Sequence, residues 1–275
     1  MTVILLALVS AATFGAMTVA VRTGLRDGGD AMGAALATLL PAFGLAVAAS
    51  LVRHDYAGAW RFWLAGLLAP GISQLLFTLA IREVGASRTS VAAGVAPLFA
   101  VAIALVFLGE PVRVLLILGG VAIVGGGVVL AAERDRPGHF RTRGLLFALG
   151  AAVMFAVRDN IVRALHAHGS PETAAAATLL AGILVALAFT RRLPTGTEVR
   201  RLAPAGALFG LSYICLFEAY FHGRVSVVSP LVATESLWGV GLSVLVFRGT
   251  EGVGRRLALG ALLVVAGGIL IGLSR

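Results

Sequence analysis

Ten apolar stretches, each of about 20 residues and each bounded by arginine, glycine or proline, limit the folds open to this chain. Such a stretch crosses the hydrocarbon core of a bilayer as an α-helix, because lipid offers no hydrogen-bond partners to an exposed backbone. The stretches are residues 2–21, 31–52, 62–81, 89–108, 112–132, 144–165, 172–190, 202–221, 225–247 and 257–273. We therefore predict an all-α integral membrane protein with ten transmembrane helices.

Composition supports a membrane protein and limits its partners. Charged residues make up only 13% of the chain, against roughly 25% in an average soluble domain. The net charge of +9 does not indicate a nucleic-acid partner, because the arginines lie between apolar stretches. Cys215 is the only cysteine, so a disulfide within the chain is excluded, and neither a metal nor another cofactor is expected. The expected partners are the lipid bilayer and a small-molecule substrate, and a monomer is a plausible assembly.

The second half of the chain repeats the first at a spacing of 141 residues. The matching pairs are Phe14 and Phe155, Arg22 and Arg163, Glu110 and Glu251, Gly119 and Gly260, and Gly126 and Gly267. Between these pairs the spacing drifts, since G-I-S at residues 71–73 resembles G-L-S at residues 210–212. A charged segment at 133–143 separates the halves, so we predict five-helix repeats at residues 1–137 and 138–275. An odd number of spans inverts the second repeat relative to the first, which is an architecture of transporters.

The arginines predict an orientation in the membrane. Fifteen of them follow the first, third, fifth, seventh and ninth stretches, and six lie at the opposite side. Cytoplasmic loops carry an excess of basic residues, so this bias places both termini outside the cytoplasm. We expect the protein in the plasma membrane, which in bacteria is the inner membrane.

Motifs at the ends of both halves resemble a known family. G-E-P at residues 109–111 and G-T-E at residues 249–251 each precede a glycine-rich stretch, and Pro97 lies in V-A-P-L-F. This pattern resembles EamA-type members of the drug/metabolite transporter superfamily. The resemblance implies secondary transport of small organic molecules, often export of amino acids, from a central cavity between the halves. It also implies cytoplasmic termini, opposite to the arginine bias.

Arg158 and Asp159 interrupt the sixth stretch and are the clearest candidates for substrate binding. A charge inside the bilayer costs several kcal/mol unless it has a partner or water. Arg158 could hold a substrate carboxylate, with Asp159 balancing it or exchanging a proton. Alternatively, Arg158 could extend to the interface, with Asp159 paired with Arg163 one turn away. Glu218, near the end of the eighth stretch, is expected on the same side of the membrane as Arg158 and could meet it, either as a structural ion pair or as a second contact to substrate.

Glu235 lies about ten residues into the ninth stretch, near the middle of the bilayer. It is too deep to reach the interface, so it must face the interior of the bundle, where it could bind substrate or carry a coupling proton. A protonated carboxyl that only packs is the alternative. Gln74 could line the same cavity or bond a neighbouring helix. Trp238 and Tyr213 could form cavity walls, although aromatic residues in membrane helices commonly face lipid or pack.

These residues predict a secondary transporter, an exporter of amino acids or similar small polar metabolites, working by alternating access around a central cavity. The first alternative is proton-coupled efflux of organic cations, in which Glu235 and Trp238 receive an aromatic cation. A channel or a structural membrane protein is the alternative from another class. An enzyme is not expected, because H-E-x-x-H and G-x-S-x-G motifs do not occur in the chain.

Overall fold

The computed structural model describes residues 2–25, 30–53, 56–107, 114–131, 141–247 and 254–273, and all regular structure in these ranges is helical. Eight helices in this part of the chain are long and apolar enough to cross a membrane, and a shorter apolar helix covers Ile117–Gly126. The chain is therefore a multi-pass integral membrane protein. The matched glutamates Glu110 and Glu251 and the boundary at residues 137 and 138 lie outside the described residues.

Each apolar stretch of the sequence overlaps helical structure. In the first half the elements are α1 (Thr2–Gly24), α2 (Ala31–Arg53), η1 (Ala59–Phe62), α3 (Trp63–Gly66), η2 (Leu67–Ile72), α4 (Ser73–Val84), α5 (Ala86–Ala93), α6 (Ala96–Phe107) and α7 (Val114–Ala131). In the second half they are α8 (Arg143–Ala164), α9 (Pro171–Phe189), α10 (Gly196–His222), α11 (Val225–Val232), α12 (Glu235–Phe247) and α13 (Arg255–Leu273).

The start of α10 differs from the expected residue 202. Thr195 and Glu198 form a capping box, in which the Thr195 side chain accepts from the Glu198 backbone and the Glu198 carboxylate accepts from the Thr195 backbone. Arg192 adds a hydrogen bond of 2.6 Å to the same carboxylate. These contacts satisfy free backbone N–H groups in the first turn, so the helix begins in a polar segment that hydropathy alone does not identify as helical.

Three of the expected membrane crossings are interrupted. The third is broken at Ala69, whose backbone is non-helical (φ −143°, ψ 118°), directly before a proline. The fourth is broken between α5 and α6, and the ninth between α11 and α12. Proline cannot donate a backbone hydrogen bond, which explains a break near Pro70. Pro41, in contrast, lies inside the unbroken helix α2.

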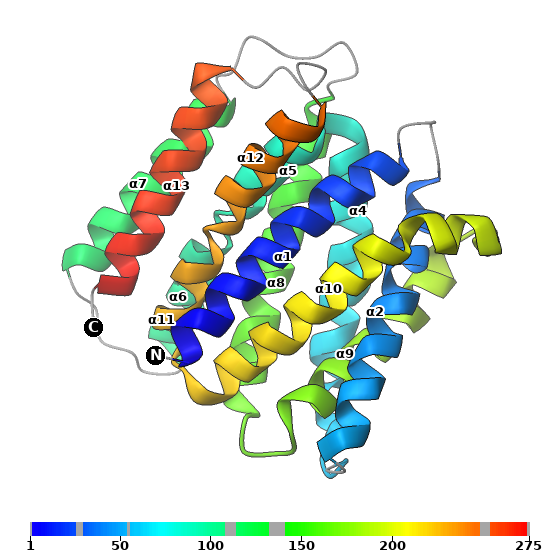
Figure 1. Ribbon diagram of the computed structural model, residues 1–275. Coiled ribbons are helices and arrows are strands. Elements are labelled where there is room, and N and C mark those ends of the chain that lie inside the picture. Colours follow the sequence, from blue (N-terminus) through cyan, green and yellow to red (C-terminus); the bar gives the residue numbers. More distant parts are fainter. Residues whose placement is uncertain are drawn as a thin grey trace.

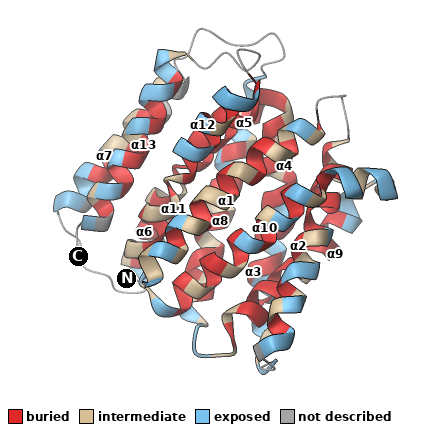
Figure 2. Ribbon diagram, viewed as in Figure 1, coloured by how far each residue is buried: buried red, intermediate tan, exposed pale blue. Residues whose placement is uncertain are grey.

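The main helix pairs each join a helix of the first half to a helix of the second half (Figure 1). Helix α1 packs against α10 and α12, while α8 packs against α4 and α6; α5 contacts α12, and α11 contacts α6. Helices α2 and α9 contact each other, as do α7 and α13, which lie side by side at one edge of the bundle in Figure 1. Figure 2 shows that the buried residues gather on the faces that the helices turn toward one another, whereas the outer faces are exposed.

Helices α7 and α13 touch through backbone. A Cβ atom built on Gly119 would lie 2.5 Å from the carbonyl oxygen of Gly267, and one built on Gly126 would lie 2.7 Å from that of Gly260. Any side chain at these positions would force the helices apart. Because the earlier residue of α7 faces the later residue of α13, the two helices run antiparallel.

The two ends of the bundle differ. Val19 near the end of α1, Ala86 at the start of α5 and Phe247 at the end of α12 pack together. At the same end, the buried Glu83 carboxylate pairs with Arg82 at 3.0 Å and with Arg143 at 3.1 Å. We call this end, at the top of Figure 1, the arginine-rich end. Helix α1 begins and α13 ends at the opposite end.

Candidate functional site

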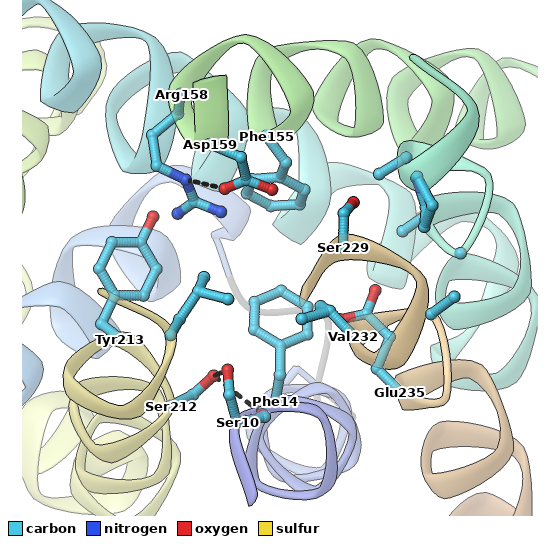
Figure 3. A pocket seen from close by; sticks show the side chains of 16 residues that line it. Ser10, Phe14, Phe155, Arg158, Asp159, Ser212, Tyr213, Ser229, Val232 and Glu235 are labelled. Atoms are coloured by element: carbon cyan, nitrogen blue, oxygen red, sulfur yellow. Dashed lines mark hydrogen bonds and ion pairs between the residues drawn. The ribbon is translucent and has the colours of Figure 1, made fainter. Parts of the chain in front are cut away.

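A cavity lies where α1, α8 and α10 meet the breaks between α5 and α6 and between α11 and α12 (Figure 3). Its lining includes Phe14, Phe155, Arg158, Tyr213 and Glu235. The volume is about 30 Å³, enough for two or three water molecules at roughly 10–15 Å³ each. The cavity therefore combines aromatic walls with charged side chains but is small in this conformation.

Arg158 and Asp159 are buried and bonded to each other. The Arg158 Nε–H donates to Asp159 Oδ1 at 2.7 Å, and the Tyr220 hydroxyl donates to Asp159 Oδ2 at 2.7 Å. Their side chains are 4% and 6% exposed, so the alternative in which Arg158 extends to the interface is wrong. The alternative pairing of Asp159 with Arg163 is also wrong, because the Arg163 guanidinium donates to backbone carbonyls at the end of α10.

Aromatic rings surround the Arg158 guanidinium. Its central carbon lies 4.9 Å from the centroid of the Tyr213 ring, 5.4 Å from that of Phe155 and 5.9 Å from that of Phe217. Each ring face attracts a cation by about 0.5–2 kcal/mol when both are desolvated. Figure 3 shows the Tyr213 hydroxyl turned toward the guanidinium. These rings and Asp159 hold the guanidinium at the cavity wall.

One nitrogen of the guanidinium remains available for a ligand. Asp159 engages only Nε, and Nη1 is buried without a hydrogen-bond partner among the described residues. Both oxygens of Asp159, in contrast, already accept hydrogen bonds. A buried donor without a partner costs about 1–3 kcal/mol, so a carboxylate entering the cavity would satisfy a group that the fold leaves unmet.

Glu235 faces the interior of the bundle, as its depth in the sequence predicts. It is the first residue of α12, it is 7% exposed, and it lines the cavity. Figure 3 shows it on the opposite side of the cavity from Arg158. None of the hydrogen bonds described for this part of the chain involves its carboxyl. The break before α12 brings this acid to the cavity wall.

Several polar residues at the site were not identified in the sequence. The Ser10 and Ser212 hydroxyls lie 3.0 Å apart and join α1 to α10 at the cavity. The repeated G-x-S pattern that contains Ser212 was a usable signal, whereas an isolated Ser10 in an apolar helix gives no indication of its partner. Asn160, which interrupts the sixth stretch beside Arg158 and Asp159, was expected to need a polar partner; it lies outside the cavity wall and donates to the Ala100 carbonyl at 3.0 Å, which joins α8 to α6.

Three of the predicted site residues lie elsewhere. Glu218 does not meet Arg158, because its carboxylate lies 3.7 Å from His222 Nδ1 and is 24% exposed. Trp238 is 48% exposed and is not part of the cavity wall. Helix α1 packs closely against it, because a Cβ atom built on Gly15 would lie 2.6 Å from the Trp238 Cβ. Gln74 is fully buried in α4 but does not line the cavity.

Comparisons with known proteins agree on the fold. The model of the EamA-like transporter family matches residues 1–132 and 142–273. A comparison with curated proteins gives no significant match. A solved structure described only as the crystal structure of a protein is similar over 99% of this chain and 97% of its own, with a TM-score of 0.74 and 20% identity. At that identity the similarity shows the fold alone.

Proposed function

This chain belongs to the EamA-like transporter family, and from that premise we propose that it is a secondary transporter that exports amino acids or similar small zwitterionic metabolites. Export and a location in the plasma membrane are the direction and place that the resemblance implies. The cavity is the proposed substrate site. The proposal depends on one observation, the placement of an unmet Arg158 donor and the Glu235 carboxyl on opposite sides of that cavity.

The two charged groups match the two ends of an amino acid. A carboxylate accepts hydrogen bonds from a guanidinium in a fixed planar geometry, so Arg158 Nη1 can take the substrate carboxylate. A carboxylate at Glu235 can take the substrate ammonium. Asp159 acts as a positioning residue, because each of its carboxylate oxygens already accepts a hydrogen bond, one from Arg158 and one from Tyr220. Phe14 and Phe155 would contact the apolar part of the substrate.

The size of the cavity supports transport by alternating access. A volume of about 30 Å³ is too small for an amino acid, so the helices around it must separate to admit one. We propose that two inverted five-helix repeats, residues 1–137 and 138–275, rock against each other around this cavity. The paired contacts support that arrangement, since the contacts of α1 with α10 and α12 have counterparts in those of α8 with α4 and α6.

The glycine contacts of α7 and α13 support the same relation. If residue i of the first repeat corresponds to residue i+141 of the second, the contact of Gly119 with Gly267 becomes that of Gly260 with Gly126. Both contacts exist. Exchanging the two repeats therefore leaves these contacts unchanged, as a two-fold axis between the repeats would require.

The matched arginines Arg22 and Arg163 support it independently. Arg22 Nη1 donates to the Ile81 carbonyl at the end of α4, at 3.4 Å. Arg163 Nη1 donates to the Tyr220 carbonyl at the end of α10, at 3.2 Å. Each arginine offsets the partial negative charge of the carbonyls at a helix end, although the Ile81 carbonyl also accepts the Gly85 backbone N–H. The same bond thus occurs once in each proposed repeat, at opposite ends of the bundle.

Purified protein in proteoliposomes tests the function. We expect saturable uptake of one or more tritiated common amino acids, faster with a pH gradient if Glu235 carries the coupling proton. Arg158→Ala should abolish uptake. Glu235→Gln should lower uptake, because the substrate ammonium loses its charged partner, and should also remove any effect of the gradient. Trp238→Phe, which changes an aromatic residue outside the cavity, is the matched control. Normal uptake by both site variants would refute the proposed site, and no saturable uptake of any amino acid would refute the substrate class.

The geometry argues against organic cations as substrates. The aromatic residue expected to receive such a cation, Trp238, faces away from the cavity. The same proteoliposomes tested with tetraphenylphosphonium should therefore show no saturable uptake.

A further inference from the structure

Helix α4 buries a polar face that the cavity does not use. Ser73, Gln74 and Thr78 are all 0% exposed. Their four side-chain polar atoms, Ser73 Oγ, Gln74 Nε2 and Oε1, and Thr78 Oγ1, have no hydrogen-bond partner within the described residues. Gln74 and Thr78 are one helical turn apart, so their side chains share a face. An unmet polar group in an apolar interior costs about 1–3 kcal/mol, so burying this cluster without partners destabilises the fold.

The same residues correspond to part of the cavity wall. The sequence G-I-S-Q at residues 71–74 lies 139 positions before G-L-S-Y at residues 210–213. In that alignment Ser73 corresponds to Ser212 and Gln74 to Tyr213, and both second-half residues line the cavity. Inverted repeats exchange conformations when the transporter turns from one side to the other. In the other conformation, Ser73 and Gln74 would then line the transport path as Ser212 and Tyr213 do in this one.

Aromatic rings join the cavity wall to helix α4. Phe77 lies on the same face of α4, one turn after Gln74. Its ring centroid is 5.1 Å from that of Phe14 and 5.9 Å from that of Phe155. Both partners line the cavity. A change in the packing of these three rings would therefore connect the cavity to the polar face of α4.

The contact of α5 with α12 closes the path toward the arginine-rich end. The Ser236 hydroxyl donates to the Ser90 carbonyl at 2.9 Å. A Cβ atom on Gly94 would collide with the Ser236 hydroxyl, and one on Gly239 would collide with that of Ser90. Helix α5 begins and α12 ends at the arginine-rich end, where Ala86 packs against Phe247. Opening toward that end requires these two helices to separate.

We propose that Ser73, Gln74 and Thr78 form a second polar site on the transport path, closed in this conformation and opened when α5 separates from α12. The site would bind neutral hydrogen-bonding groups of the substrate, because Arg158 and Asp159 correspond to Met17 and Thr18 in the first half. Substrate is held there by hydrogen bonds without charged partners, so it leaves more readily than from the cavity. This inference rests on the proposed exchange between two conformations.

Cysteine labelling tests the inference without knowledge of the substrate. Cys215→Ala removes the only native cysteine, and Gln74→Cys then places one thiol at the proposed site. N-ethylmaleimide should label this thiol slowly in membrane vesicles. Adding Gly239→Val, which forces α5 and α12 apart, should raise the labelling rate about tenfold by populating the open conformation. A rate that does not change with Gly239→Val would overturn the proposal.

Thr178→Cys is the matched control. Thr178 is 0% exposed, lies in α9 and bonds its own helix through the Ala175 carbonyl. Its labelling should remain slow in the presence of Gly239→Val. An equal rise at Thr178 would mean that the variant loosens the whole bundle, and the proposal would be abandoned. Because labelling does not depend on uptake, a failed amino-acid assay and a failed labelling assay remain distinguishable.

A second measurement covers the case in which Gly239→Val does not fold. Gln74→Leu removes the unmet amide at similar volume. If Gln74 only packs, this change should leave amino-acid uptake in proteoliposomes intact and leave the unfolding midpoint unchanged or higher. If the proposal holds, uptake falls at least about tenfold at an unchanged midpoint, because substrate desolvates without a partner in the second site. Ser243→Ala, which removes another unmet buried hydroxyl, should leave uptake unchanged.

Discussion

Replacing Asp159 by asparagine leaves the Arg158 guanidinium buried without its counter-charge. Asp159 accepts one hydrogen bond from Arg158 Nε and one from the Tyr220 hydroxyl, both at 2.7 Å. An asparagine of the same shape offers only one acceptor oxygen and sets an NH₂ group against the other donor. Breaking a buried ion pair by removing one partner costs about 3–5 kcal/mol. We expect the Asp159→Asn variant to lose that much of its free energy of unfolding.

The first repeat supplies the matched control. At the corresponding positions it carries Met17 and Thr18, so an apolar and a neutral polar residue are compatible with this fold. A double variant, Arg158→Met with Asp159→Thr, removes both charges and the desolvation cost of each. It should therefore be more stable than Asp159→Asn alone, although it should not take up amino acids.

Both variants can be compared with the parent protein by unfolding in detergent micelles with increasing SDS, followed by far-UV circular dichroism. The reasoning predicts the order parent, double variant and single variant, from most to least stable. A single variant as stable as the parent would show that Asp159 does not hold the guanidinium. A double variant less stable than the single one would show that the charges stabilise the fold and are not merely compensated.

Two further predictions concern packing away from the cavity, and both can be measured in the same unfolding assay. Gly267→Val should lower the free energy of unfolding by about 1–3 kcal/mol, because the added carbons collide with the Gly119 carbonyl. Gly125→Val, whose side chain meets open space, should lower it little. Equal losses in the two variants would contradict the backbone contact between α7 and α13. Glu83→Gln should lower the free energy of unfolding by about 1–2 kcal/mol, because it weakens the hydrogen bonds from Arg143. The loss is modest because Arg143 is exposed to water. An unchanged unfolding midpoint would show that this ion pair does not stabilise the fold.

The sequence predicted the helices well because hydropathy reports directly on the bilayer. All ten apolar stretches overlap helical structure, since each must satisfy its backbone internally. It failed at the start of α10, where a capping box extends the helix through polar residues. It also did not distinguish Pro41, which lies inside a continuous helix, from Pro70, which adjoins a break. Whether a proline breaks a membrane helix depends on neighbours that only the tertiary structure supplies.

The site was partly predictable for the same physical reason. Arg158, Asp159 and Glu235 were identified because a charge inside a membrane helix needs a polar environment, and the structure buries all three at the cavity. Glu218 was expected to meet Arg158, and Trp238 was expected to form a cavity wall, but Glu218 lies beside His222 and Trp238 lies outside the cavity. The sequence gives the depth of each residue along its helix, but packing sets the rotation of the helix about its axis and hence the direction in which the side chain points. The arginine bias for the orientation of the termini stays a prediction.

The central claim is that one cavity holds both ends of a zwitterion, and competition in proteoliposomes tests it most directly. The uptake of tritiated leucine, or of whichever amino acid in the panel gives the fastest uptake, would be measured against three unlabelled competitors. These are the same amino acid, its methyl ester, which lacks the carboxylate, and the corresponding carboxylic acid, which lacks the amino group. We predict that only the parent amino acid competes strongly, because the ester cannot pair with Arg158 and the acid cannot pair with Glu235. Equal competition by the methyl ester and the parent amino acid would contradict the account.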